Sequence, residues 1–261
     1  MKFENVKIGQ KKSTMDSPVL NTPEFHKLTK EWNSQRLKII GTSHIAKQSV
    51  NEIKKAFEGF QPDVVGVELD IQRAKSLMQD QKNEISIAAI RQIGVKGYVF
   101  AKIGQIVQKK LGTAVGVSPG TEMKTAITLA AKGKKEVAFI DQPIQITLRK
   151  FSKNLTWKEK FRFLGDIFKG MLFPKKQIEQ YGLDGFDLSK VPKEEFIGKM
   201  MLQMKERYPN VYKTLVSDRN LYMYKHIVKI LRTFPEKKVL IIVGAGHKEG
   251  IEEMLNRVDV I

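Results

Sequence analysis

The sequence predicts an α/β fold with a mostly parallel central sheet flanked by helices, and with a large helical insertion or cap. Short apolar runs alternate along the chain with segments of helical periodicity, which is typical of βαβ units. The run Val64–Leu69 is almost continuously apolar, as expected of a strand that is covered on both faces. Hydrophobic residues make up 41% and charged residues 28% of the 261 residues, so the composition is that of a globular protein.

The chain divides into two regions. Residues 1–35 are polar with little periodicity, and we expect a weakly ordered lead-in before an α/β domain at residues 36–261. The first residues lack the apolar segment of a signal peptide, and no run approaches the roughly 18 apolar residues that span a bilayer. We therefore expect a soluble chain that is cytoplasmic or lies at the face of a membrane.

Apolar periodicity predicts the order of elements within this domain. Four strands are expected, and they are Leu37–Ile40, Val64–Leu69, Glu136–Ile140 and Lys238–Val243. Helices are expected over Ser49–Phe60, after Asp70 as a cap, over residues 83–112 with interruptions, over Thr121–Lys132 and over Lys248–Asn256. The helical insertion covers about residues 146–232, broken at its prolines and glycines, and Val258–Ile261 is a candidate last strand.

Polar residues follow the predicted strands where chemistry is expected. His44 and His247 each stand three positions after a glycine that ends a strand, and Glu68 and Asp141 lie at the ends of two other strands. The carboxyl ends of parallel strands share one edge of a sheet, so these side chains could meet there. Two imidazoles with one or two carboxylates suit a divalent metal ion. The alternative is that each histidine caps a strand end and binds only backbone.

Glu68, Glu122 and two arginines also have explanations that require no functional role. Glu68 lies within an apolar run, so its carboxylate requires a metal, a cation or a hydrogen-bonding partner, and Arg73 is the nearest such cation in the sequence. Glu122 lies in the first turn of a helix, where the helix dipole favours an acid. Arg149 and Arg219 could be surface cations.

Positive charge is concentrated in one part of the chain. The formal net charge is +18, and residues 82–176 contribute 19 Lys and Arg against 6 Asp and Glu. This block is compatible with an anionic membrane surface, with nucleic acid or with a solvated exterior. No zinc finger or RNP-like run is present, so we expect no nucleic acid. The absence of cysteine excludes disulfides, thiolate zinc sites and a thiol nucleophile.

Six segments in order resemble the motifs of the TraB/PrgY (pheromone shutdown) family. They are Gly41–Val50, which contains a Gly-x-x-His motif, Pro62–Arg73, Pro119–Met123, Asp141–Arg149, Asp218–Met223 and Val243–Ile251, which contains the second Gly-x-x-His motif. The fifth of these segments usually contains Glu-Arg-Asp in the family, whereas this chain has Asp218, Arg219 and Asn220. An amide therefore stands directly after the arginine, where the family pattern has a carboxylate.

The resemblance implies a fold like that of ChaN and erythromycin esterase. It also implies a relation to Tiki proteins, which are metal-dependent peptidases, with His44, His247 and Glu68 in the metal and catalytic centre. The metal would be a divalent ion such as Mn, Co, Fe or Zn. Many prokaryotic members continue into a C-terminal membrane region that this sequence does not contain.

Two functions are carried forward from the sequence, and we favour the first. In a metal-dependent peptidase or related hydrolase, His44, His247 and a carboxylate would bind the metal, with Asp141 or Glu122 completing the shell. Glu68 would be the base if it is not a ligand, and Arg73, Arg149 or Arg219 would hold a substrate carboxylate or an oxyanion. The second is a peptide-binding or membrane-associated regulatory protein without catalysis. A homo-oligomer is compatible with either.

Overall fold

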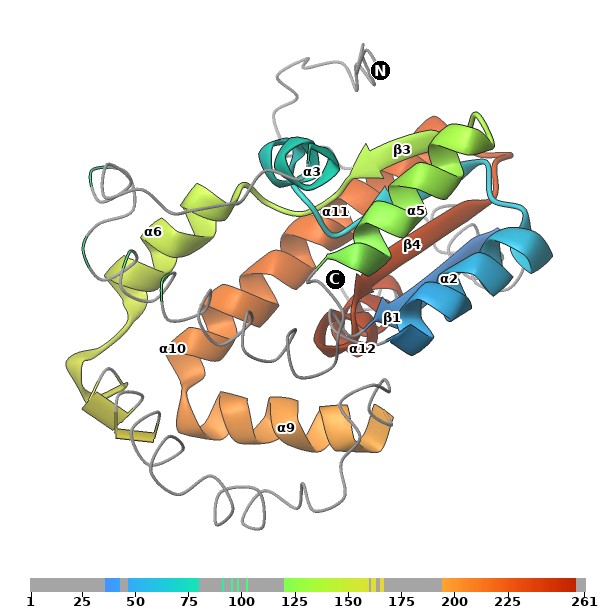
Figure 1. Cartoon of the computed structure of the whole chain (residues 1–261). Coiled ribbons are helices and arrows are strands. Elements are labelled where there is room, and N and C mark those ends of the chain that lie inside the picture. Colours follow the sequence, from blue (N-terminus) through green and yellow to red (C-terminus); the bar gives the residue numbers. More distant parts are fainter. Residues whose placement is uncertain are drawn as a thin grey trace.

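The computed structural model contains a four-stranded, fully parallel sheet with helices on both faces (Figure 1). It describes residues 36–42, 47–79, 120–159 and 194–256, together with single residues or pairs at 91, 95, 98, 102, 161–162 and 165–166. The predicted lead-in at residues 1–35, most of the helical stretch at 83–112 and the candidate strand Val258–Ile261 lie outside the described residues.

The strands form in the predicted places and are ordered β1-β4-β2-β3. Their bounds are Leu37–Thr42 for β1, Val64–Val67 for β2, Glu136–Phe139 for β3 and Val239–Gly244 for β4. The central strand β4 is buried along its whole length, as its unbroken apolar sequence predicts. In register, Thr42 at the end of β1 lies opposite Gly244 at the end of β4.

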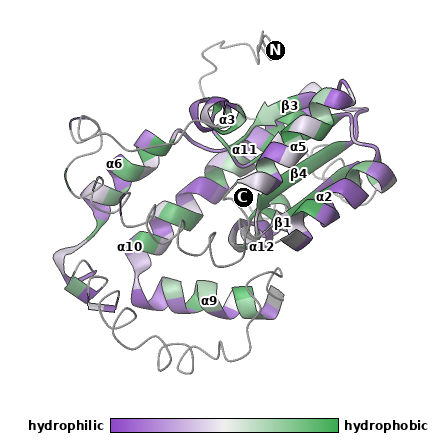
Figure 2. Ribbon diagram, viewed as in Figure 1, coloured by the Kyte–Doolittle hydropathy of each residue, from purple (hydrophilic) through white to green (hydrophobic). Residues whose placement is uncertain are grey.

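Alternate residues of β4 pack into two separate apolar layers, because successive side chains of a strand point to opposite faces. Val239, Ile241 and Val243 pack with α11 (Asp218–Thr233) and α12 (Ala245–Asn256). Leu240 and Ile242 pack with α2 (Lys47–Phe60) and α5 (Thr121–Lys132). Figure 1 shows α2 and α5 in front of the sheet and α11 behind it. In Figure 2 the strands are hydrophobic, and the side of α2 that faces away from the sheet is hydrophilic.

Local signals account for the helices that follow β2 and precede β3. Asp70 caps α3 (Ile71–Met78), since its Oδ1 accepts hydrogen bonds from the backbone N–H groups of Gln72 and Arg73. Gly120 precedes α5 with φ of +85°, a left-handed conformation that side chains other than glycine rarely adopt.

The described parts of the predicted insertion are helical. They include α6 (Ile144–Asn154), α9 (Glu194–Arg207), α10 (Pro209–Tyr212) and a π-helical turn η3 (Lys213–Ser217), which leads directly into α11. The apolar pattern of the sequence does not indicate the π-turn. Such turns are frequent at functional sites. Among the described residues, no helix is long and apolar enough to cross a membrane.

One helix boundary differs from the prediction in a way that affects the site. We expected the last helix to begin at Lys248, but α12 begins at Ala245, directly after β4. His247 therefore lies inside the first turn of α12 and not in a loop before it. A Cβ on Gly246 would lie 3.3 Å from the Met201 side chain, so glycine lets this first turn pack closely against α9.

Candidate functional site

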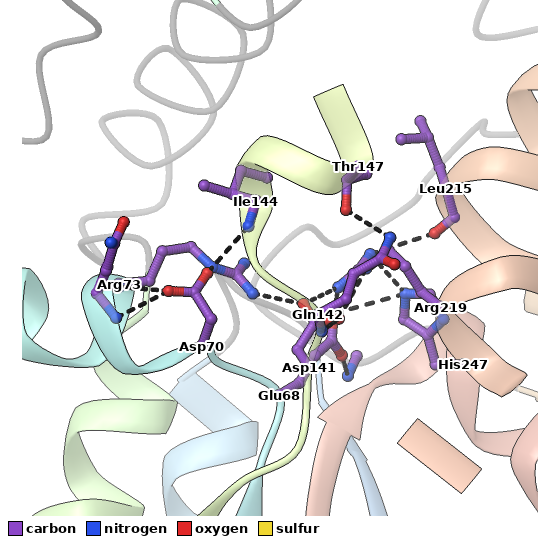
Figure 3. A network of polar contacts seen from close by, with 12 residues as sticks. Glu68, Asp70, Arg73, Asp141, Gln142, Ile144, Thr147, Leu215, Arg219 and His247 are labelled. Atoms are coloured by element: carbon purple, nitrogen blue, oxygen red, sulfur yellow. Dashed lines mark hydrogen bonds and ion pairs between the residues drawn. The ribbon is translucent and has the colours of Figure 1, made fainter. Parts of the chain in front are cut away.

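Buried polar side chains converge at the carboxyl edge of the sheet (Figure 3). Glu68 follows β2, Asp141 follows β3, and His247 stands in the first turn of α12 after β4. Arg219 comes from the first turn of α11, on the face of the sheet that α11 covers. Four elements that are far apart in the sequence thus contribute to one cluster, as expected where parallel strands end.

Arg219 lies at the centre of this cluster. Its Nε donates to Asp141 Oδ1 at 3.1 Å, and its Nη2 donates to Asp141 Oδ2 at 2.7 Å and to Glu68 Oε1. Its Nη1 lies 2.9 Å from His247 Nε2 and donates to the Leu215 carbonyl at 3.2 Å. A guanidinium has five N–H groups, and these contacts use all five. A substrate could therefore be bound by Arg219 only after one of these contacts breaks.

The charges of the cluster interact strongly because its acids are almost completely buried. The side chains of Glu68 and Asp141 are 4% and 1% exposed, and that of Arg219 is 15% exposed. Burial by itself would lower the pKa of Arg219, but the charges of Glu68 and Asp141 and the hydrogen bonds to both raise its pKa above the ordinary value. Arg219 is therefore held as a permanent cation between two carboxylates.

Glu68 also binds the start of α12. Its Oε2 accepts a hydrogen bond from the Gly244 backbone N–H at 2.5 Å, and its Oε1 lies 3.5 Å from His247 Nε2. Backbone N–H groups at a helix start lack partners within the helix, and the helix dipole favours an anion there. The Glu68 carboxylate thus joins β2, β4 and α12 at one point.

The hydrogen bonds of His247 define its protonation. A guanidinium can only donate, so the contact with Arg219 makes Nε2 of His247 the acceptor. The other ring nitrogen, Nδ1, lies 2.6 Å from Oδ1 of Asn220, and it carries a proton and donates a hydrogen bond to this oxygen. With this pattern of contacts His247 is a neutral imidazole whose Nε2 lone pair points to the guanidinium of Arg219.

A second ion-pair group lies next to the first. Asp70 Oδ2 accepts from Arg73 Nε at 2.8 Å and from the Ile144 backbone N–H at 3.3 Å. Arg73 also pairs with Asp141, so Asp141 is shared between Arg73 and Arg219. On the other side, Gln142 donates to Thr147 Oγ1 at 2.7 Å, which connects the cluster to α6. The sequence suggested Arg73 as the partner of Glu68, whereas the structure pairs Glu68 with Arg219.

The remaining candidate residues are placed differently. His44 lies outside the described residues, two positions beyond the end of β1. Glu122 is fully buried in the first turn of α5. Arg149 is exposed on α6, whereas Arg219, for which a surface position was an alternative, is largely buried. Within the described ranges, no three His, Asp or Glu side chains are arranged so that they could hold a metal ion.

Sequence reasoning missed Asn220 as a site residue and gave Asp70 only its capping role. Asn220 is 4% exposed and binds a histidine that lies 27 positions further along the chain. Its one signal was its place directly after Arg219, where the family pattern has an acid. The Leu215 carbonyl had no signal, because its contact with Arg219 depends on the π-turn that contains it.

Comparison with known proteins covers nearly the whole chain. The model of the TraB/PrgY/gumN family matches residues 25–259. An uncharacterized protein of Methanocaldococcus jannaschii is 30% identical over 223 residues, which are 85% of this chain and 53% of that protein. TraB domain-containing proteins of Bos taurus and Homo sapiens are each 26% identical in an alignment of 249 positions that covers 85% of this chain and 63% of those proteins. The chain thus spans between half and two thirds of the length of these relatives.

A solved structure was also found. An erythromycin esterase mutant in its open conformation aligns with 87% of this chain and 66% of its own, at 15% identity and a TM-score of 0.32. At this TM-score the alignment has no bearing on the function.

Proposed function

The chain belongs to the TraB/PrgY/gumN family, and we propose that its buried polar cluster is the active site of a metal-dependent hydrolase that acts on peptides. The observation that supports this proposal is the meeting of Glu68, Asp141, Arg219 and His247 at the carboxyl edge of a parallel sheet. Burial of carboxylates costs free energy of desolvation, and buried ionisable groups of this kind are concentrated at functional sites.

The donor atoms suit a divalent ion in kind. Glu68 and Asp141 offer carboxylate oxygens, and His247 offers Nε2, whose lone pair accepts a hydrogen bond from Arg219. With its proton on Nδ1, the imidazole has the neutral form that a metal ligand requires. His44 is the further ligand in this proposal, because β1 ends at Thr42, opposite Gly244 at the end of β4. A divalent ion bound by these residues would polarise a carbonyl oxygen and activate water.

The residues of this chain have separate roles in the proposed reaction. Asn220 orients His247 and keeps its proton on Nδ1. Glu68 is the candidate base if it is not itself a ligand, since a carboxylate in a buried, polar site can accept a proton from water. Arg73 is the side chain best placed to bind a substrate carboxylate, because 27% of its side chain is exposed to solvent. Its ion pairs with Asp70 and Asp141 hold the guanidinium at the edge of the cluster.

Metal analysis of the protein, purified without a chelator or a metal-affinity tag, tests this function. We expect His247→Ala and His44→Ala each to lower both the metal content and the cleavage of a fluorogenic peptide library by at least tenfold. His226→Ala is the matched control, because His226 stacks on Tyr222 and contacts the Tyr222 carbonyl on α11. If metal content and cleavage persist in both His247→Ala and His44→Ala, the proposal is wrong.

A second role, binding at an anionic membrane surface, is supported by a different observation. Trp157 and Phe161 are 66% and 68% exposed and stack on each other with ring centroids 6.0 Å apart. Lys153 and Lys158 near them are also exposed. Exposed aromatic rings beside lysines complement the interface of an anionic lipid bilayer. This role does not depend on the polar cluster, and it would remain in a protein that binds peptides without cleaving them.

A further inference from the structure

Strand β3 is an edge strand of the sheet, and it leads to the polar cluster. In the order β1-β4-β2-β3 it pairs with β2, and among the described residues no strand lies on its other side. Figure 1 shows β3 along the upper edge of the sheet, with α5 in front and α11 behind. Asp141, which pairs with Arg73 and Arg219, follows two positions after Phe139, the last residue of β3. The edge of β3 therefore runs directly into the cluster.

Backbone groups on the outer side of β3 are available for hydrogen bonding. The N–H groups of Glu136 and Ile140 each donate at 3.1 Å to a carbonyl on the β2 side, so the even-numbered residues face β2. Backbone direction alternates along a strand, and the N–H and C=O groups of Val137 and Phe139 therefore point away from β2. Within the described part of the chain, these outward groups have no hydrogen-bond partner. Such an edge is a template for a further strand.

The length and the residues of this edge favour a short peptide as its partner. Val137 and Phe139 are apolar and only partly buried against α5, and β3 contains no lysine. The opposite edge strand, β1, carries the exposed Lys38, and lysine on an edge strand opposes further pairing. Two outward-facing residues offer four backbone groups, which suits a short extended segment. A stable dimer would have to bury about 1,200 Å² or more, which so short an edge does not supply.

We propose that an extended peptide binds along β3 as an additional strand, through the outward N–H and C=O groups of Val137 and Phe139, and that this pairing brings the peptide to the polar cluster. Pairing of this kind uses the main chain of the peptide, so it accepts many sequences. Arg73, 27% exposed and paired with Asp141 beyond the end of β3, is available there to a carboxylate of the peptide. The inference rests on the proposed function for the kind of ligand, a peptide, and it requires no metal ion.

The first test follows the amide hydrogens of Val137 and Phe139 in the wild type by ¹⁵N NMR. The probe is a pool of random hexapeptides, with a chelator present so that the peptides are not cleaved. We expect the pool to slow the exchange of both hydrogens with solvent at least tenfold, because both donate to the added strand. The same pool with every residue N-methylated should leave the exchange unchanged, since the methyl groups prevent the close approach of a strand.

Two results of this test would overturn the inference. The first is equal exchange of the two amide hydrogens with the unmodified and the N-methylated pool. The second is exchange that is already slow without peptide, in a protein that sediments as a dimer, because the edge of β3 would then bind a second copy of the chain.

The second test measures the affinity of a fluorescein-labelled hexapeptide pool for Val137→Pro by fluorescence anisotropy. Proline removes an N–H that faces away from β2, and edge strands tolerate proline at such positions. We expect binding at least fivefold weaker than in the wild type. Ile39→Pro is the matched control, because Ile39 is a partly buried apolar residue that faces outward on the other edge strand, β1. That control should leave the affinity unchanged, and equal affinity of Val137→Pro and the wild type would overturn the inference.

These measurements separate the inference from the proposed function. Slower exchange at Val137 and Phe139 in a protein that cleaves no peptide would support the inference and contradict the function. Cleavage of the fluorogenic library at equal rates by the wild type and by Val137→Pro would leave the function intact and overturn the inference. The exchange test uses the wild type, so it remains decisive if Val137→Pro does not fold.

Discussion

At the scale of single residues, Asn220 and Gly250 show how two helices align His247. A Cβ added to Gly250 of α12 would lie 2.3 Å from Nδ2 of Asn220 on α11, so only glycine leaves room for that amide. Oδ1 of Asn220 in turn accepts a hydrogen bond from His247 Nδ1 at 2.6 Å. The close approach of α11 and α12 therefore contributes to the protonation of the histidine.

Gly250→Ala should destabilise the protein by about 1–3 kcal/mol, because the added methyl group overpacks the contact with Asn220. Gly59→Ala is the matched control, since Gly59 also lies in a helix but a Cβ there would meet nothing within 4 Å. That control should be neutral or stabilising, as alanine favours helices by up to about 1 kcal/mol over glycine. Urea unfolding of both variants measures the difference.

The double variant Gly250→Ala with Asn220→Ala sharpens this test. Truncation of Asn220 removes the atom that the new methyl group would meet, so the two losses of stability should sum to more than the loss in the double variant. Additive losses would show that Gly250 and Asn220 are not in contact, and equal stability of Gly250→Ala and Gly59→Ala would show the same.

The requirement of Glu68 for a buried partner could be predicted from one residue in its sequence context, but the identity of the partner could not. A carboxylate in an apolar run must be compensated, and that requirement is local. Arg73 was the nearest cation in the sequence, whereas the actual partner, Arg219, is 151 positions away and reaches Glu68 from another layer. Asn220 was missed for the same reason.

At the scale of elements, Glu159 connects the segment after α6 to the start of α10. Its Oε2 accepts from Thr156 Oγ1 at 3.0 Å and from Asn210 Nδ2 at 2.8 Å, and its Oε1 accepts from the Asn210 backbone N–H at 2.8 Å. The residue is 4% exposed. Burial by itself would raise the pKa of Glu159, but the hydrogen bonds from Asn210 and Thr156 outweigh it and lower the pKa below its ordinary value of 4.5.

A lowered pKa in the folded state makes stability depend on pH in a defined direction. The contribution of ionised Glu159 is fully present above the unfolded pKa of about 4.5 and is lost as the pH falls through the lower folded value. Glu159→Gln should therefore cost about 1–3 kcal/mol at neutral pH and make the loss of stability below pH 4.5 shallower. Thermal unfolding across this range measures both effects. Glu206→Gln, at an exposed position on α9, is the control, and an equal pH profile for the two variants would contradict the prediction.

Most elements could be predicted from apolar periodicity. Their first or last residues differ from the prediction where tertiary contacts extend the element. Strand β1 continues two residues beyond the predicted Ile40, because Gly41 and Thr42 pair with Val243 and Gly244 of β4. Helix α12 starts three residues before the predicted Lys248. Neither extension adds to an apolar pattern, so neither could be inferred from the sequence around it.

At the scale of the whole molecule, the proposed active site and the proposed membrane surface use different residues and should be separable. Vesicles that contain phosphatidylserine should bind the protein at low salt and release it as salt rises, since screening shortens to about 8 Å at physiological ionic strength. Trp157→Ser with Phe161→Ser should lower this binding at least fivefold in a sedimentation assay. Leu202→Ser, at an exposed apolar position on α9, is the matched control.

A chelator separates the two roles in the same sample. It should abolish peptide cleavage while vesicle binding persists, because the lysines and aromatic rings need no metal. Cleavage that continues in the presence of the chelator would contradict the hydrolase proposal. An absence of vesicle binding at low salt would instead indicate that the basic block of residues 82–176 is a solvated exterior.

By itself, the amino-acid sequence determined the α/β class, the four strands, the family and the need of Glu68 for a partner. The class, the strands and the requirement of Glu68 follow from periodicity and from buried charge, which depend on neighbouring residues. The family follows from the resemblance of motifs that occur in order along the chain. Only the tertiary structure decided the strand order β1-β4-β2-β3 and the central place of Arg219. The strand order and the pairing of Arg219 with Glu68 and Asp141 depend on contacts between segments 70 or more positions apart. Such contacts arise only when the layers pack, because no local pattern specifies which distant cation will neutralise a buried acid.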